Sequence, residues 1–362
     1  AAAGATALHL SVPIAIGICG LLAILIISYE QTIHAYPDGG GAYIVARDNI
    51  GDLPAQIAAA ALLTDYILTV AVSISSGVAQ LVSAFPFLET YKVIIAVSFV
   101  LMVMMVNLRG VKESGIAFAI PTYFFLVMMY LTVAIGFIRM ILGNLVAVDG
   151  PPMDLMNTHE SLQAVTIFLI LKAFASGTTA VTGVEAISNG ITAFREPRSK
   201  NAGQTLIMMG VILGTLLFSI TFLGNHVGVM PSENETVISQ LARTIFASRG
   251  FPYLLTITST TVILVMAANT AFADFPRLAA IAAKDGYLPR QMTYKGSRLV
   301  FSRGIVALAL IASLLIIVFK ASVTRLIPLY AIGVFLSFTM SQAGMAHRWW
   351  KSGHLKPGEE IV

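Results

Sequence analysis

The sequence predicts an all-α membrane protein, a helical bundle with about nine transmembrane helices. Three observations support this fold class. The 362 residues are 57% hydrophobic and only 11% charged, with a mean hydropathy of +0.84, whereas soluble domains carry about 25% charged residues. Long apolar runs recur along the chain, and Lys and Arg cluster between them. One apolar run is interrupted by glycines and hydroxyls, as in the broken helices of transporters.

Nine segments are apolar and long enough to approach the roughly 20 residues that a membrane-spanning helix needs. They are residues 12–35, 54–85, 91–106, 115–142, 163–191, 203–229, 251–274, 304–319 and 323–346. The second and the fifth are long enough to tilt or bend. The Gly-rich stretch YPDGGGAY after the first span reads as a turn. We therefore expect one transmembrane domain over residues 1–362 and no soluble domain.

Lys and Arg are unequally divided between the two sets of loops. Fifteen lie in the set that begins after the first span and six lie in the opposite set. Because basic residues favour the cytoplasmic side, this predicts a multi-pass protein of the cell membrane whose residues 347–362 form a cytoplasmic tail. The basic residues form no continuous stripe, so nucleic acid is not an expected partner.

Two function classes find no support in the residues. The single cysteine, Cys19, can form no internal disulfide and no thiolate metal cage. The sequence contains no HExxH motif, no His-rich or Cys-rich cluster and no compelling Ser-His-Asp order. We therefore expect neither an enzyme nor a cofactor, and the only metal ion expected is a transported one.

The second span carries a polar stripe in the stretch LLTDYILTVAVSISSG. Asp65, Thr69, Ser73 and Ser76 recur at spacings of four, four and three, so they share one helix face, with Tyr66 beside Asp65. A carboxylate followed by hydroxyls can replace part of the water shell of a cation, or carry a proton. The alternative is a polar helix–helix contact.

The fifth span contains the stretch ASGTTAVTGVEAISN, whose glycines and β-branched residues disfavour a continuous helix. We expect residues 176–183 to be unwound and Glu185 to begin the next half-helix, near the positive end of its dipole. Close packing through small residues is the alternative. The residues expected in or beside the break are Ser176, Gly177, Thr178, Thr179, Thr182 and Gly183.

Other polar residues within spans have ordinary explanations. In the seventh span, Asp274 lies near the expected cytoplasmic end and can cap the helix or pair with Arg277. Lys172 in the fifth span can extend its stem towards the membrane surface.

The position of the break predicts an internal repeat. Five spans begin at the break and only four precede it, yet a broken helix usually has a mate in an inverted repeat. We therefore expect a LeuT-type bundle of five plus five helices whose first helix is missing. Residues 1–162 would form the rest of the first repeat and residues 163–346 the second, with both chain ends truncated.

The chain resembles the amino acid–polyamine–organocation (APC) superfamily and, within it, bacterial potassium importers of the KUP type. The similar stretches are YPDGGGAYIVARDNIG, LLTDYILTVAVSIS, NLRGVKESG, ASGTTAVTGVEAISN, FREPRSKNAGQTL, AANTAFADFPRLA and LIPLYAIGVFLSFTMSQAGM. This resemblance implies potassium uptake coupled to protons. It places potassium at Asp65, Tyr66, Thr69, Ser73 and Thr182, and it places Glu185 beside the pathway.

We therefore predict a secondary transporter that imports potassium by proton symport. Glu185 is the predicted proton carrier, because burial favours the neutral form of a carboxyl group. The predicted partners are potassium ions, protons and the lipid bilayer, and a homodimer stays an option. A proton-coupled amino acid permease of the same superfamily is the first alternative, and a membrane receptor or structural protein without transport is the second.

Overall fold

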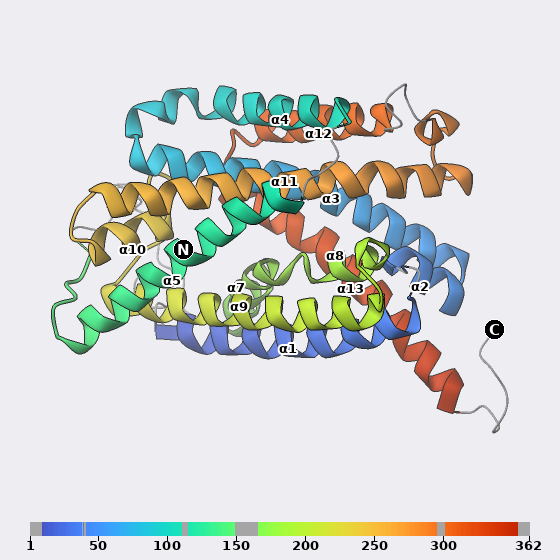
Figure 1. Ribbon diagram of the computed structural model, residues 1–362, viewed down its shortest axis with the longest axis horizontal. Helices are drawn as coiled ribbons and strands as arrows, with labels where there is room; N and C mark the ends of the chain where they lie inside the picture. Colours follow the sequence, from blue (N-terminus) through green and yellow to red (C-terminus); the bar gives the residue numbers. More distant parts are fainter. Residues whose placement is uncertain are drawn as a thin grey trace.

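The computed structural model describes residues 9–37, 39, 41–110, 115–148, 166–294 and 301–353. Every regular element among these residues is helical (Figure 1). Eight stretches of the described chain are long and apolar enough to cross a membrane, and Ser302–Val318, with 17 residues, lies at the lower limit of length. The predictions of an all-α membrane protein and of about nine spans are confirmed.

The elements follow one another closely along the chain. In order they are α1 (Ser11–Ala35), α2 (Gly41–Asn49), α3 (Asp52–Ala84), η2 (Pro86–Tyr91), α4 (Lys92–Leu108), α5 (Gly115–Ile141), α7 (Ile167–Gly177), η3 (Thr178–Val181), α8 (Val184–Asn189), η4 (Ile191–Ala193), α9 (Arg198–Val227), α10 (Val237–Ile245), α11 (Phe251–Lys284), η5 (Arg290–Thr293), α12 (Ser302–Val318) and α13 (Val323–Gly353). The expected junction of the two repeats, near residue 162, lies outside the described residues.

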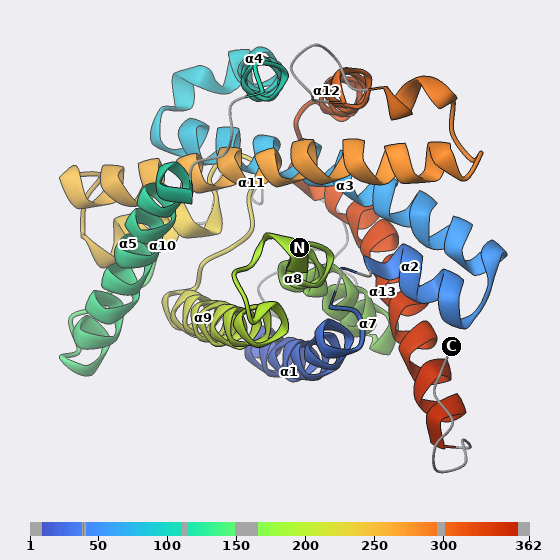
Figure 2. The same cartoon turned by 45° about the vertical axis from the view of Figure 1, so that its right-hand side comes forward.

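The long helices pack as neighbouring pairs. Helix α4 lies beside α12 at one edge of the bundle, α3 lies along α11 in the next layer, and α1 lies beside α9 at the opposite edge (Figures 1 and 2). The short helices α7 and α8 lie between these layers, and α13 crosses the bundle and packs against α3 and α2. The break between α7 and α8 therefore lies inside the bundle, whereas α7 itself has no buried residue.

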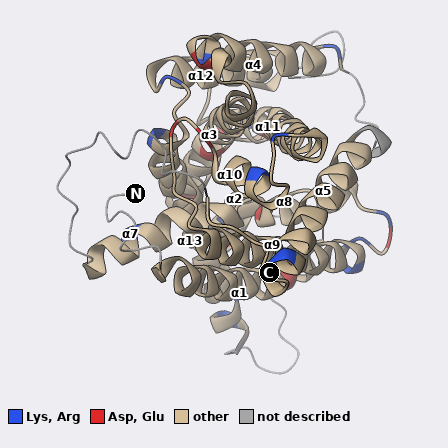
Figure 3. Cartoon of the chain, turned by 90° about the vertical axis from the view of Figure 1, so that its left-hand side faces the viewer, with Lys and Arg blue, Asp and Glu red and all other residues tan. Residues whose placement is uncertain are grey.

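The outer faces of the helices suit contact with lipid. Most of the helical ribbon carries neither a basic nor an acidic residue (Figure 3). Large apolar side chains are instead exposed, among them Ile24 at 64%, Leu310 at 62% and Phe168 at 75%. The opposite faces of α1, α3, α11, α12 and α13 contribute to one buried apolar core. A bilayer can cover such exposed surface, whereas water would penalise it.

Several element boundaries differ from the sequence expectations. Helix α11 continues ten residues past the expected end at residue 274, because Ala279–Ala283 supply a further apolar face that is buried. The turn expected in YPDGGGAY ends early, since α2 begins at Gly41 and buries Tyr43, Val45 and Ala46. The sequence analysis did not predict α2 as a helix, because α2 has only nine residues and its last turn carries a charged pair, Arg47 and Asp48.

Helix α13 approaches α2 through a glycine. A Cβ atom added at Gly344 would lie 2.8 Å from Val45 Cγ1 and 2.9 Å from the Val45 carbonyl oxygen. We expect Gly344→Ala to lower the free energy of unfolding by about 1–3 kcal/mol, since overpacking forces backbone shifts. Thermal unfolding in detergent measures this. Gly20→Ala is the matched control, because nothing lies within 4 Å of its added Cβ, and equal melting temperatures of the two variants would contradict the contact.

Candidate transport site

The interrupted span changes conformation at two residues. Helix α7 ends at Gly177, and one 3₁₀ turn follows over Thr178–Val181. Thr182 is extended, with φ −68° and ψ 156°, and Gly183 is left-handed, with φ +91°. Glycine is the residue best suited to that left-handed position. Helix α8 then begins at Val184, so the chain changes direction between α7 and α8.

The break is narrower than the sequence analysis expected. Ser176 and Gly177 are not unwound, because they are the last residues of α7. Thr178 and Thr179 lie in the 3₁₀ turn, and their hydroxyls donate to the carbonyls of Ala175 and Ser176 at 2.8 and 2.7 Å. These local bonds hold the turn together. The carbonyls of Ala175 and Ser176 therefore already accept hydrogen bonds from these hydroxyls.

Glu185 lies in the first turn of α8 and is buried. Its two carboxylate oxygens accept hydrogen bonds from the backbone N–H of Gly183 at 3.2 and 3.0 Å. The carboxylate therefore folds back over the break instead of extending away from it. This contact ties the only charged side chain of α8 to the residue at which the helix is interrupted.

A tyrosine joins the broken span to α3. The Tyr330 hydroxyl on α13 donates to Thr182 Oγ1 at 2.8 Å and accepts from Thr69 Oγ1 at 3.3 Å. Thr69 and Thr182, which the sequence analysis placed in one site, are thus brought together. Tyr330 was missed there, although a single phenol in the apolar run LIPLYAIGVFLSF was a usable signal.

Asp65 is buried beside this bridge, with 3% of its surface exposed. Among the described residues, its Oδ1 atom has no hydrogen-bond partner. Gly333 on α13 packs close to the α3 backbone here, because a Cβ atom added to it would lie 3.5 Å from Asp65 N. The carboxyl groups of Asp65 and Glu185 also interact electrostatically. One carboxyl group of α3 and one of α8 therefore lie in the same buried region of the bundle.

The remaining predicted site residues are less closely connected. The Tyr66 hydroxyl accepts a bond from Asn189 Nδ2 at 3.4 Å, so it contacts α8. Ser73 is half-buried on α3, and within the described chain its hydroxyl makes no hydrogen bond with this cluster. Asp274 pairs with Arg277 at 3.8 Å, as one sequence reading expected. Lys172 is exposed on α7.

A second group of contacts joins α2, which precedes α3, to the end of α11. Tyr43 on α2 donates a hydrogen bond to the carboxylate of Asp285, which follows α11, and Arg47 pairs with Asp285 at 3.6 Å. Burial, followed by the neighbouring Asp285, raises the pKa of Tyr43 to about 12. The phenol therefore stays protonated at physiological pH and remains a hydrogen-bond donor. Its bond to Asp285 holds α2 against the end of α11.

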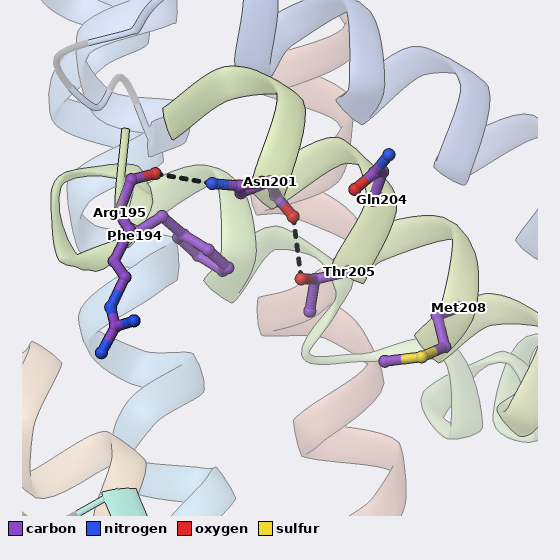
Figure 4. Close-up of a pocket in the computed structure, with 6 residues that line it drawn as sticks. All are labelled: Phe194, Arg195, Asn201, Gln204, Thr205 and Met208. Carbon is purple, nitrogen blue, oxygen red and sulfur yellow. Dashed lines mark hydrogen bonds between the residues drawn. The ribbon is translucent and has the colours of Figure 1, made fainter. Parts of the chain in front are cut away.

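A surface hollow lies apart from the buried carboxyl groups. It has a volume of about 440 Å³ and is lined by residues of the loop before α9 and of the first turns of α9 (Figure 4). Asn201 Nδ2 donates to the carbonyl of Arg195, and the Thr205 hydroxyl donates to the carbonyl of Asn201, both at 2.8 Å. The Asn201 amide holds the loop before α9, and the Thr205 hydroxyl bonds its own helix. The hollow is therefore not part of the site between α3 and α8.

A bundle of membrane-length helices with an interrupted helix and buried carboxyl groups at its centre is the architecture of a permease. The profile of a family described as amino acid permease matches residues 1–360. The chain therefore belongs to the amino acid permease family, whose members are transporters and not enzymes.

A comparison with curated proteins gives a more specific relative. The chain is 47% identical over 347 residues to the potassium transporter KimA of Bacillus subtilis (strain 168). The alignment covers 96% of this chain and 56% of that relative, so the chain spans little more than half the length of the relative. The expected resemblance to the APC superfamily is confirmed.

The bridging phenol can be tested by removing its oxygen alone. We expect Tyr330→Phe to weaken rubidium binding about tenfold, because the two hydrogen bonds that position Thr69 and Thr182 are lost and a net loss of about 1.4 kcal/mol corresponds to a factor of ten. Equilibrium binding of ⁸⁶Rb⁺ to the purified protein measures the change. Tyr91→Phe, at an exposed tyrosine, should bind as the unaltered protein does. Equal affinities for both variants would remove Tyr330 from the site.

Proposed function

We propose that the protein imports potassium across the cell membrane. One observation carries the proposal: the hydroxyls of Thr69, Tyr330 and Thr182 meet beside the buried Asp65, whose Oδ1 has no partner among the described residues. A buried carboxylate without a partner is costly. A dehydrated monovalent cation would balance its charge, and the neutral hydroxyls would replace part of the water shell of the ion.

The proposed potassium ligands are those that the sequence analysis named, with one addition. Asp65 supplies the charge, and Thr69 and Thr182 supply hydroxyl oxygens. Tyr66 supplies its phenol or shapes the site, and Tyr330 supplies a further phenol oxygen. Ser73 stays a prediction, since it lies one helical turn from Thr69 on the same face of α3. The potassium transport named for the relative supports this choice of ion.

Protons are the proposed coupling ions. Two carboxyl groups in one apolar interior repel each other when both are ionised, and a single proton relieves that repulsion. Glu185 is the proposed carrier because it lies at the break, where a change in backbone conformation alters its contacts. Cation entry beside Asp65 and proton transfer at Glu185 are then linked through the same electrostatic interaction.

Orientation and symmetry form the next part of the proposal. The excess of Lys and Arg puts the end of α13 in the cytoplasm. Residues 1–162 and 163–346 would be parts of two inverted repeats. The packing of α1 with α9, α3 with α11 and α4 with α12 supports this. If the first helix of the first repeat is missing, each pair joins helices at the same position in the two repeats. A homodimer also belongs to the proposal.

An amino acid permease is the second candidate, because the matching family is described by that substrate. Uptake of ⁸⁶Rb⁺ and of radiolabelled amino acids into proteoliposomes separates the two. We expect saturable rubidium uptake that an inward proton gradient stimulates and that amino acids do not inhibit. Saturable amino acid uptake without rubidium uptake would overturn the potassium proposal.

A further inference from the structure

Asn189, the last residue of α8, contacts the transport site from the side of the broken helix. Its side-chain Nδ2 donates a hydrogen bond to the Tyr66 hydroxyl of α3 at 3.4 Å, and Asn189 is the only hydrogen-bond partner of that hydroxyl among the described residues. The Tyr66 phenol also interacts electrostatically with three carboxyl groups, those of Asp65, Glu185 and Asp274. One neutral amide therefore holds this phenol in a region of acidic groups.

The direction of that hydrogen bond matters for cation binding. A phenol oxygen carries one hydrogen and two lone pairs, and a cation binds a lone pair. Carboxylates accept hydrogen bonds, so the acidic groups attract the hydroxyl hydrogen. The Asn189 amide engages the oxygen as a donor and holds the hydroxyl on the side of α8. The second lone pair is then available to an ion.

The other atom of the Asn189 amide faces the glycine-rich turn YPDGGGAY. Its Oδ1 is buried and has no hydrogen-bond partner among the described residues. A Cβ atom added at Gly41, the first residue of α2, would lie 2.9 Å from this Oδ1, and one added at Gly39 would lie 3.4 Å from the Asn189 carbonyl oxygen. The turn therefore packs on Asn189 with no room for a side chain at residue 41, which confines the amide at its Oδ1 end.

Asn189 also shares a helix with the proposed proton carrier. Glu185 lies four residues earlier in α8, so the two side chains project from the same face of that helix. Glu185 accepts a bond from the backbone of Gly183 at the break, and Asn189 donates to Tyr66 on α3. One short helix thus connects the interrupted backbone to the aromatic residue that follows Asp65.

We propose that Asn189 is a positioning residue for potassium binding. Its amide orients the Tyr66 phenol for the ion, and the glycines at residues 39 and 41 hold the amide in place. This inference rests on the proposed potassium transport, with Tyr66 as a ligand. It also gives the glycine-rich turn before α2 a role, because a side chain at residue 41 would displace the amide.

A double-mutant cycle tests this role. We expect Asn189→Ala to raise the KM for ⁸⁶Rb⁺ uptake into proteoliposomes about fivefold and to leave kcat unchanged, because the lost hydrogen bond prepares the site for the ion. A fivefold change corresponds to about 1 kcal/mol, the usual contribution of one hydrogen bond. In the Tyr66→Phe background, which has no hydroxyl to orient, Asn189→Ala should not change the KM further. A purely structural role of Asn189 would raise the KM equally in both backgrounds.

The glycine-rich turn supplies an independent variant. Gly41→Ala keeps the amide but displaces it, so it should raise the KM about fivefold in the unaltered protein and add no further increase to that of Asn189→Ala. Gly143→Ala is the matched control, because both glycines are left-handed, with φ +45° at Gly41 and +69° at Gly143, and nothing lies within 4 Å of a Cβ atom added at Gly143. The control should transport rubidium with an unchanged KM.

The outcomes separate this inference from the function on which it rests. An unchanged KM in Asn189→Ala, or the same increase with and without the Tyr66 hydroxyl, would overturn the positioning role and leave potassium transport standing. An unchanged KM in Gly41→Ala would overturn it even if Asn189→Ala did not fold. Absence of rubidium uptake by the unaltered protein would overturn both the positioning role and the proposed function.

Discussion

Asp65→Asn is expected to abolish rubidium uptake at micromolar concentrations. The substitution keeps the shape of the side chain and removes its charge from a buried position. A unit charge about 4 Å from a cation contributes about 4 kcal/mol when the effective dielectric constant is about 20. Its loss corresponds to about a thousandfold in affinity. Concentration dependence of ⁸⁶Rb⁺ uptake by proteoliposomes measures the effect.

The matched control lies on the same helix. Asp52 is an exposed carboxylate in the first turn of α3, and Asp52→Asn should transport rubidium as the unaltered protein does. If Asp65→Asn were indistinguishable from Asp52→Asn, then the carboxylate would not hold the ion, and the buried Asp65 would need a purely structural explanation.

Glu185→Gln is expected to separate rubidium uptake from the proton gradient. A gradient of one pH unit is worth about 1.4 kcal/mol, enough for about tenfold accumulation when one proton enters with each ion. The amide cannot exchange this proton, so the variant should lose the tenfold stimulation by an acidic exterior. Uptake of ⁸⁶Rb⁺ at equal and at unequal pH across the membrane measures the loss.

A second acidic residue controls for that change. Glu196 has an exposed side chain in the loop before α9, where it pairs with Arg198, and Glu196→Gln should retain proton stimulation. Proton stimulation that persists undiminished in Glu185→Gln would exclude Glu185 as the carrier. Asp65 would then be the remaining buried carboxyl group at this site.

Composition and periodicity predicted the membrane class, because long apolar runs have few other stable environments. Helix periodicity placed Asp65 and Thr69 on one face of α3, and only the resemblance to potassium importers added Thr182 to the same site. Both missed Tyr330, since tyrosine is also common at membrane surfaces, and only the fold shows that its hydroxyl bridges two other helices. Which side chains of other helices a residue contacts depends on the tertiary fold, and the sequence of one segment does not specify it.

The length of the interruption between α7 and α8 also could not be predicted from the sequence. Glycine and threonine predicted strain around residues 176–183, but the threonine hydroxyls stabilise a 3₁₀ turn by bonding to carbonyls three residues earlier. Helix propensity alone does not include this compensation. In the same way, the buried apolar face of α11 past Asp274 outweighed the polar signals that suggested an earlier end.

The central claim is that a monovalent cation binds between α3 and the interrupted helix. Anomalous diffraction from crystals of the protein grown in rubidium tests it most directly. We predict an anomalous peak in direct contact with oxygen atoms of Asp65, Thr69 and Thr182. Difference density for an amino acid over the break at Thr182–Gly183, with no rubidium peak beside Asp65, would contradict the claim.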